Sequence, residues 1–201
     1  MPYLLLFVGF FLFIFSVLML FIPSFNHVDF SLIEWMSQHR TTYLNQISIV
    51  LSMIGGMPFA LFLTTIWCLH QSWYKKYANA TFISLGLIGS IATVWLLKYL
   101  ISRPRPPEMF HLVQSYGASF PSAHSVYAAT LGCLAIYLSQ QHPNKKFVYF
   151  YAVMWLFMMG MSRIYLGVHF LSDVLAGWSI SFIWITLLYL LYAKLSGKKT
   201  N

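Results

Sequence analysis

The chain has 201 residues, of which 59% are hydrophobic and only 8% are charged. Soluble domains carry about 25% charged residues, so this composition excludes an ordinary soluble protein and indicates one integral membrane domain over residues 1–201. The net charge of +8 is explained by basic residues on cytoplasmic loops, and these residues form no aromatic-interleaved stripe, so nucleic acid is not expected as a partner.

Six apolar segments are candidates for membrane-spanning helices, since about 20 apolar residues cross the hydrocarbon core. They are Tyr3–Ile22, Ile49–His70, Ala80–Ile101, Ser122–Ser139, Phe147–Met161 and Leu171–Tyr192. The fifth is short and is expected to extend toward Ile164. In the second, Gly55, Gly56 and Pro58 predict a kink or a close helix contact. The sequence therefore predicts an all-α fold, a bundle of six transmembrane helices.

A short interfacial helix is expected after the first span, over Asp29–Arg40. Its apolar residues would rest on lipid, while Asp29, Glu34 and Arg40 would face water. An irregular loop is an equal alternative for this segment.

The distribution of lysines predicts the orientation. Lys75, Lys76, Lys145, Lys146, Lys194, Lys198 and Lys199 would all lie on one side of the membrane. That side should be cytoplasmic, because Lys and Arg accumulate on cytoplasmic loops. Both termini would then be cytoplasmic, and the polar clusters described next would meet at the outer face.

The last polar cluster contains Ser162-Arg163, His169 and Asp173. On a helix, residues four apart share one face, so Asp173 can hold one imidazole N–H of His169 and leave the other nitrogen free as a nucleophile. The alternatives are a surface ion pair or half of a metal site. Arg163 is a candidate phosphate ligand, or it reaches toward lipid headgroups.

The middle cluster is Phe120-Pro121-Ser122-Ala123-His124. Pro121 and Ser122 predict the start of a helix, where unpaired backbone N–H groups attract phosphate oxygens. Ser122 adds a hydroxyl donor, and His124 is placed to give a proton to a leaving oxygen. The alternative is simple helix capping beside an interfacial histidine.

The first cluster runs from Lys98 to Glu108 and includes Arg103-Pro-Arg105-Pro. Two arginines in this run cannot easily point the same way. We expect one to fork onto phosphate and the other to face water or headgroups. Glu108 is a candidate partner for Arg103, and His111, in the same loop, is a candidate substrate contact. The alternative for the whole cluster is a plain basic membrane boundary.

Taken together, these clusters resemble the motifs of the type 2 phosphatidic acid phosphatase family of membrane lipid phosphatases. The family pattern is Lys-x6-Arg-Pro, then Pro-Ser-Gly-His, then Ser-Arg-x5-His-x3-Asp. The first spacing selects Arg105 over Arg103, and the last motif fits in full. Ala123 stands where glycine is usual, and a backbone that needs positive φ would be strained there. The motif-bearing part covers about residues 80–192.

The resemblance implies hydrolysis of a lipid phosphate that needs no metal or other cofactor. Carried over by position, His169 attacks phosphorus, Asp173 orients it, and His124 protonates the leaving group. The phosphoryl oxygens are held by Lys98, Arg105, Ser122, Ala123 and Arg163.

The short chain is similar to small bacterial members of the family, which implies a place in the bacterial inner (plasma) membrane. Their usual substrates are undecaprenyl diphosphate, phosphatidylglycerophosphate, phosphatidate and lipid A phosphates, and outer-face orientation favours the first. Membrane lipids and the substrate are the partners expected, with no obligate protein partner evident. A transporter and a catalytically silent lipid-binding protein are the alternatives from other classes.

Overall fold

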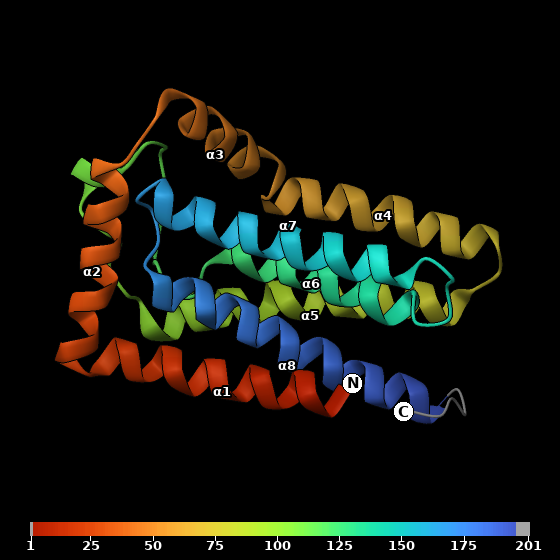
Figure 1. Ribbon diagram of the computed structural model, residues 1–201. Helices are drawn as coiled ribbons and strands as arrows, with labels where there is room; N and C mark the ends of the chain where they lie inside the picture. The colour runs from red at the N-terminus through yellow and green to blue at the C-terminus, as the bar shows by residue number, and fades with distance from the viewer. Residues whose placement is uncertain (1, 196–201) are drawn as a thin grey trace.

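The computed structural model describes residues 2–195, which form helices and loops and contain no strand. In chain order the helices are α1 (Pro2–Phe21), α2 (Pro23–Gln38), α3 (Thr42–Ile54), α4 (Met57–Trp73), α5 (Tyr77–Ile101), the 3₁₀ helix η1 (Glu108–Phe110), α6 (Ala123–Leu138), α7 (Lys145–Tyr165) and α8 (Leu171–Leu195). The long helices run side by side, and α2 lies across one end of the bundle (Figure 1). The start of α1 and the end of α8 lie at the other end.

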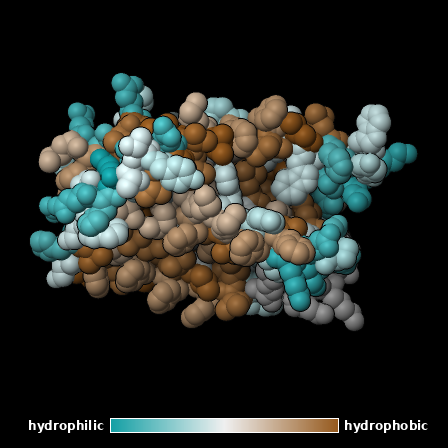
Figure 2. All heavy atoms as spheres, turned by 45° about the horizontal axis from the view of Figure 1, so that its top comes forward, coloured by the Kyte–Doolittle hydropathy of each residue, from teal (hydrophilic) through white to brown (hydrophobic). Residues whose placement is uncertain are grey.

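Among residues 2–195, four helices, α1, α5, α7 and α8, are long and apolar enough to cross a membrane, and α3 with α4 would form a fifth, broken span. Helix α6 has 16 residues, which at about 1.5 Å per residue falls short of the ~30 Å hydrocarbon core. On the face that Figure 2 shows, apolar side chains cover most of the middle of the molecule, and hydrophilic ones gather toward both ends. The predicted helical membrane protein is confirmed, with four or five candidate spans and not a demonstrated six.

The predicted kink in the second span is confirmed. The segment divides at Gly55 and Gly56 into α3 and α4, which meet at a bend of 56°. Pro58 lies in the first turn of α4, where its missing N–H breaks no helical hydrogen bond. The bend carries the end of α3 toward the site described below. The expected extension of the fifth span is also confirmed, since α7 continues to Tyr165.

The predicted interfacial helix is present as α2, but its environment differs from the prediction. Asp29 does not face water: it is completely buried and ion-paired with Arg103. The positive charge of Arg103 compensates the carboxylate for its loss of hydration. The sequence pattern does not reveal this pairing. On the apolar side, Ile33 and Met36 pack against Ile164 and its neighbours in the core, so that part of the face lies on protein and not on lipid.

Small polar side chains join three helices in the interior. Thr130 of α6 shares hydrogen bonds with Ser90 of α5 at 2.7 Å and with Ser181 of α8 at 3.0 Å. All three side chains are completely buried. Hydrogen bonds of this kind stabilise helix contacts in membranes, where the hydrophobic effect does not drive association. They hold α6 between α5 and α8, and so fix where α6 begins.

Candidate active site

A cavity of about 700 Å³ lies at the end of the bundle near α2 and brings the three polar clusters together. Its charged and imidazole-bearing lining residues are Lys98, Arg105, His124, Arg163 and His169. They come from α5, the loop after it, α6, α7 and the loop before α8. Residues that lie up to 71 positions apart in sequence, from Lys98 to His169, therefore face one space.

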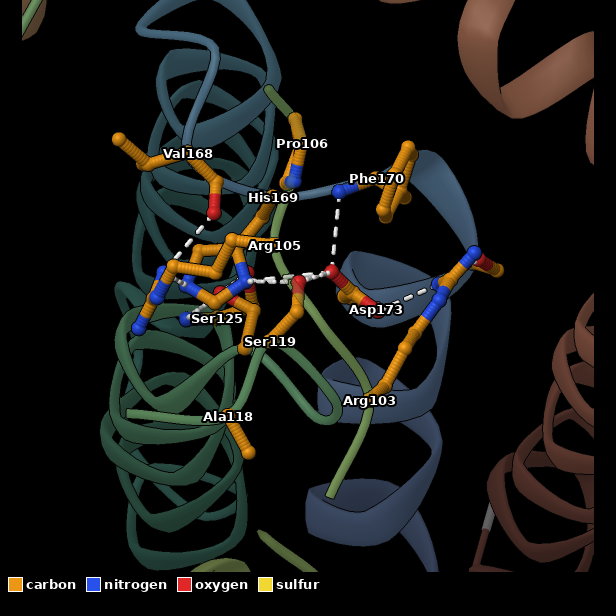
Figure 3. A network of polar contacts seen from close by, with 12 residues as sticks. Arg103, Arg105, Pro106, Ala118, Ser119, Ser125, Val168, His169, Phe170 and Asp173 are labelled. Carbon is orange, nitrogen blue, oxygen red and sulfur yellow. Dashed lines mark hydrogen bonds and ion pairs between the residues drawn. The ribbon is translucent and has the colours of Figure 1, made fainter. Parts of the chain in front are cut away.

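The imidazole of His169 lies between a carboxylate and the cavity. Its Nδ1 is 3.3 Å from Oδ2 of Asp173, and its Nε2 is 3.3 Å from Nη1 of Arg105. Because a guanidinium only donates, Nε2 is the accepting nitrogen and Nδ1 carries the proton toward Asp173. Figure 3 shows the ring between these two partners. The nitrogen with the free lone pair is therefore the one that faces Arg105 and the cavity, and the other nitrogen faces Asp173.

The turn that presents His169 depends on a glycine. Gly167 has a φ of 74°, and a Cβ built on it would lie 2.0 Å from the carbonyl oxygen of Phe110. Only glycine fits a positive φ with such a close backbone neighbour. The turn between α7 and α8 thereby packs closely against the end of η1.

Burial controls the charge state of His169. It lowers the pKa of the ring to about 3; the hydrogen bond and charge of Asp173 oppose this, while Arg105 and Arg163 lower the pKa further. The imidazole is therefore neutral near pH 7, the form required for attack. Burial also lowers the pKa of Arg105, an effect that Asp173 partly offsets, but a guanidinium remains protonated in proteins.

Backbone carbonyls hold the guanidinium of Arg105 in the cavity wall. Nη1 donates to the carbonyl of Val168 at 2.8 Å, Nη2 to that of Tyr116 at 2.8 Å and Nε to that of Gly117 at 3.0 Å. Lys98 is held in the same way, with Nζ donating to the carbonyl oxygens of Ala118 and Ser119. Both cations are thus fixed in the cavity wall by backbone carbonyls, and Arg105 lies beside Nε2 of His169.

Ser52, near the end of α3, contacts two predicted site residues. Its carbonyl lies 3.0 Å from Nε2 of His124, and its hydroxyl accepts from Nη1 of Arg163 at 2.5 Å. A carbonyl only accepts, so Nε2 of His124 carries a proton. The bend between α3 and α4 therefore positions both the predicted acid and one predicted phosphate ligand.

The start of α6 agrees with the predicted helix N-terminus, with one difference. Ser122 is the N-cap, completely buried, and its hydroxyl accepts from Ser125, so it does not line the cavity. Ala123 does line it and is the first residue of the helix. Within residues 2–195 the only non-glycine residues with positive φ are Lys75 and Ser102, so alanine causes no strain at position 123.

Three expectations for the loop after α5 need correction. Arg103 does not face water or headgroups, because it is buried between two carboxylates, those of Asp29 and Asp173. Glu108 is not its partner for the same reason. His111 contacts the carbonyl of Pro106 at 2.9 Å and does not line the cavity.

The sequence interpretation missed four residues that the structure places around the site: Asp29, Ser52, Arg103 in its buried role, and Ser119. The hydroxyl of Ser119 donates to Oδ2 of Asp173, the oxygen that faces His169. Ser119 lies two residues before Pro121, at the edge of the middle cluster. Only this position beside the motif could have indicated Ser119 from the sequence. The residue type alone indicates little, because serine is common in loops and turns.

Comparisons with known proteins identify the family of the chain. Residues 73–196 match the family model described as the PAP2 superfamily. Phosphatidylglycerophosphatase B of Bacillus subtilis is 32% identical over 72% of this chain and 73% of its own length. Undecaprenyl-diphosphatase BcrC of the same organism is 29% identical over 79% of each chain. Lipid A 1-phosphatase of Rhizobium etli is 30% identical over 77% of this chain and 67% of its own.

Solved structures show the same fold. The crystal structure of a transmembrane PAP2 type phosphatidylglycerolphosphate phosphatase from Bacillus subtilis has a TM-score of 0.82 and 28% identity, covering 96% of this chain and 98% of that one. Aquifex aeolicus LpxE has a TM-score of 0.67 at 23% identity, over 82% and 95% of the two chains, and supports the fold alone. Since the family model matches more than half of the sequence, the chain belongs to the PAP2 superfamily of membrane lipid phosphatases.

Proposed function

We propose that this protein hydrolyses a lipid phosphate or diphosphate through a phosphohistidine intermediate, without a metal ion. One observation carries the proposal. The accepting nitrogen of His169 faces a cavity lined by three cations, Lys98, Arg105 and Arg163, while its other nitrogen lies against a buried carboxylate. Phosphoryl transfer depends mainly on positioning and charge stabilisation, which three fixed cations supply.

In the first step, Nε2 of His169 attacks phosphorus, and the bond from phosphorus to the leaving oxygen breaks. His124 gives a proton to that oxygen, which departs as the lipid alcohol or, from a diphosphate, as the lipid monophosphate. Asp173 stabilises the positive imidazole that forms. In the second step, His124, which lost a proton in the first step, takes one from the water that attacks the phosphohistidine; the P–N bond breaks, His169 is freed, and inorganic phosphate leaves.

For the substrate we propose undecaprenyl diphosphate, converted to undecaprenyl phosphate. A named relative with this activity covers 79% of each chain. Phosphatidylglycerophosphate, phosphatidate and lipid A phosphates are the alternatives, and relatives named for the first and last of these match with similar identity. The apolar helix faces that would grip the lipid chain carry little specificity that can be read from residue types.

The proposed orientation places the cavity at the outer face of a bacterial plasma membrane, with both termini in the cytoplasm. In support, Lys75, Lys76, Lys145, Lys146 and Lys194 lie in or beside the helix ends remote from α2, and lysine-rich ends face the cytoplasm. Lys198 and Lys199 lie outside the described residues. With α6 as a short span and α3–α4 as one broken span, the bundle would cross the membrane six times.

Phosphate release from purified protein in detergent micelles tests this function. Wild type should release phosphate from at least one of undecaprenyl diphosphate, phosphatidylglycerophosphate and phosphatidate, compared by kcat/KM in matched micelles. His169→Ala should lose at least ~10³-fold while remaining folded, and His39→Ala, an exposed residue remote from the cavity, should keep wild-type activity. EDTA should leave turnover intact, and loss that a divalent ion restores would refute metal independence.

The same assay separates the alternatives from other classes. A transporter or a catalytically silent lipid-binding protein would release no phosphate from any of the three lipids or from lipid A. The charged lining residues gather at one end of the bundle and not along a path through it, which favours the hydrolase.

A further inference from the structure

Arg103 links the interfacial helix α2 to the proposed nucleophile. Its Nη1 lies 2.6 Å from Oδ1 of Asp173, and its Nη2 lies 2.9 Å from Oδ2 of Asp29. The arginine side chain is 9% exposed and both carboxylates are 0% exposed. Figure 3 shows Arg103 on the side of Asp173 that faces away from His169. A buried chain of charged groups therefore runs from Asp29 through Arg103 and Asp173 to His169.

Within this chain, the two oxygens of Asp173 have separate partners. Oδ1 accepts from Arg103, while Oδ2 accepts from the hydroxyl of Ser119 and from the amide of Phe170 at 2.9 Å, and faces Nδ1 of His169. A carboxylate held at both oxygens cannot rotate, so the direction of its hydrogen bond to the imidazole is fixed.

Asp29 balances the charge of Arg103. Its carboxylate also accepts from the amide and the hydroxyl of Ser172, which fixes it at the start of α8. Asp29, Arg103 and Asp173 together carry one net negative charge. Without Asp29, the guanidinium would cancel the negative charge of Asp173, which the developing imidazolium of His169 needs.

We infer that Arg103 and Asp29 are positioning residues of the phosphatase reaction: Arg103 orients Asp173 toward His169, and Asp29 neutralises Arg103 so that Asp173 keeps its full effect on the imidazole. The guanidinium also lies 4.1 Å from the centroid of the Phe170 ring, which closes the network on a further side. Neither residue lines the cavity, so both act through Asp173 and not on substrate. The inference rests on the proposed function.

The test compares four proteins: wild type, Arg103→Gln, Asp29→Asn and the double variant. Arg103→Gln removes a positive charge, so the network near His169 becomes more negative by one and favours the protonated ring. The acid limb of kcat/KM, which is the loss of activity at low pH, should therefore move to higher pH by at least about 0.5 unit. Asp29→Asn removes a negative charge and should move it the opposite way. The double variant restores the net charge and should return the limb toward wild type. The ionisation of the substrate is the same for all four proteins, so any difference between their acid limbs comes from the enzyme.

Both single variants should lower kcat at least about tenfold and change KM little, because the affected residues do not touch substrate. Arg103→Lys keeps the charge but cannot bridge two carboxylates, so it should keep the wild-type acid limb with a reduced kcat. The other charged groups that face His169, Arg105 and Arg163, are unchanged in every variant.

Active variants with equal losses at every pH and an unmoved acid limb would overturn the inference and reduce the network to a structural role. If Arg103→Gln does not fold, Asp29→Asn and the double variant still decide, since the inference requires their acid limbs to differ. A wild-type protein that releases no phosphate from any lipid would instead refute the proposed function, which keeps the two failures distinct.

Discussion

Nη1 of Arg105 lies 3.3 Å from Nε2 of His169, so the resting structure has a cation directly against the nitrogen that is proposed to attack phosphorus. The same guanidinium is held from behind by the carbonyls of Val168, Tyr116 and Gly117. An oxygen of a phosphoryl group that enters the cavity would replace Nε2 of His169 as the acceptor of the hydrogen bond from Nη1 of Arg105. The arginine would then neutralise charge on the group under attack.

Arg105→Lys should therefore be far from conservative. Lysine keeps the positive charge but offers one donor centre in place of a fork, and it cannot use the three carbonyl contacts. We expect kcat/KM to fall about 10²-fold, the scale of losing one oriented donor to a developing charge. The measurement is steady-state phosphate release. Arg40→Lys is the control, since Arg40 contacts the carbonyls of Phe110 and Tyr165 outside the cavity, and an equal loss there would contradict the assignment.

Ser52→Ala tests how Arg163 is held. The substitution removes the hydroxyl that accepts from Nη1 of Arg163, while the carbonyl that contacts His124 remains. Hydrogen bonds to charged groups contribute about 1.5–3 kcal/mol, so kcat/KM should fall roughly tenfold or more, with KM raised because Arg163 is a proposed phosphate ligand. Ser48→Ala, buried one turn earlier on α3, is the matched control. Activity unchanged in Ser52→Ala would show that Arg163 does not depend on this contact.

Gly167→Ala should disturb the turn that presents His169. Both Gly167 and Gly117 have positive φ, but only at Gly167 would a Cβ meet backbone, at 2.0 Å from the carbonyl of Phe110; at Gly117 it would meet nothing within 4 Å. Alanine at position 117 should cost only the strain of the left-handed conformation, about 1–2 kcal/mol. Thermal unfolding in detergent compares the two, and Gly167→Ala should melt at clearly lower temperature. Equal melting temperatures would contradict the tight packing of this turn.

Stability should also depend on pH through His169. Burial lowers the pKa of the ring in the folded protein from its usual 6.5 to about 3. Between these two pH values the ring is protonated in the unfolded chain but neutral in the folded protein. Stability is thus greatest above about pH 6.5 and is lost as pH falls toward 3. His169→Gln should lose less thermal stability than wild type between pH 7 and pH 5. His142→Gln, at an exposed loop position, should behave as wild type, and identical acid sensitivity in all three proteins would exclude this effect.

The sequence was sufficient to predict six of the residues that line the cavity: Lys98, Arg105, Ala123, His124, Arg163 and His169. His169 and Asp173 are four residues apart at the start of a helix, and such local spacing determines which side chains meet. Lys98 and Arg105 lie seven residues apart, and both donate hydrogen bonds to backbone carbonyls of the same loop, those of Ala118 and Tyr116. The contact between His169 and Asp173 is local, so the spacing predicts it directly, whereas Lys98 contacts the carbonyl of Ala118, 20 positions away, through the fold of the loop.

The second layer of the site could not be predicted in this way. Arg103 donates a hydrogen bond to Asp29, 74 positions away in sequence, and Arg163 donates one to Ser52, 111 positions away. Each pairing depends on how α2 and α3 pack against the bundle, which hydrophobic pattern alone does not specify. The amphipathic pattern of Asp29–Arg40 predicted that Asp29 faces water, and only a partner that tertiary structure brings close, Arg103, explains why it is buried instead.

The central claim is that His169 carries the phosphoryl group during turnover, and the most direct measurement is mass spectrometry of protein quenched in mid-reaction. The account predicts a phosphoryl adduct on His169 in wild type, and none in His169→Ala. An adduct on another residue, or burst kinetics with no adduct on His169, would contradict it.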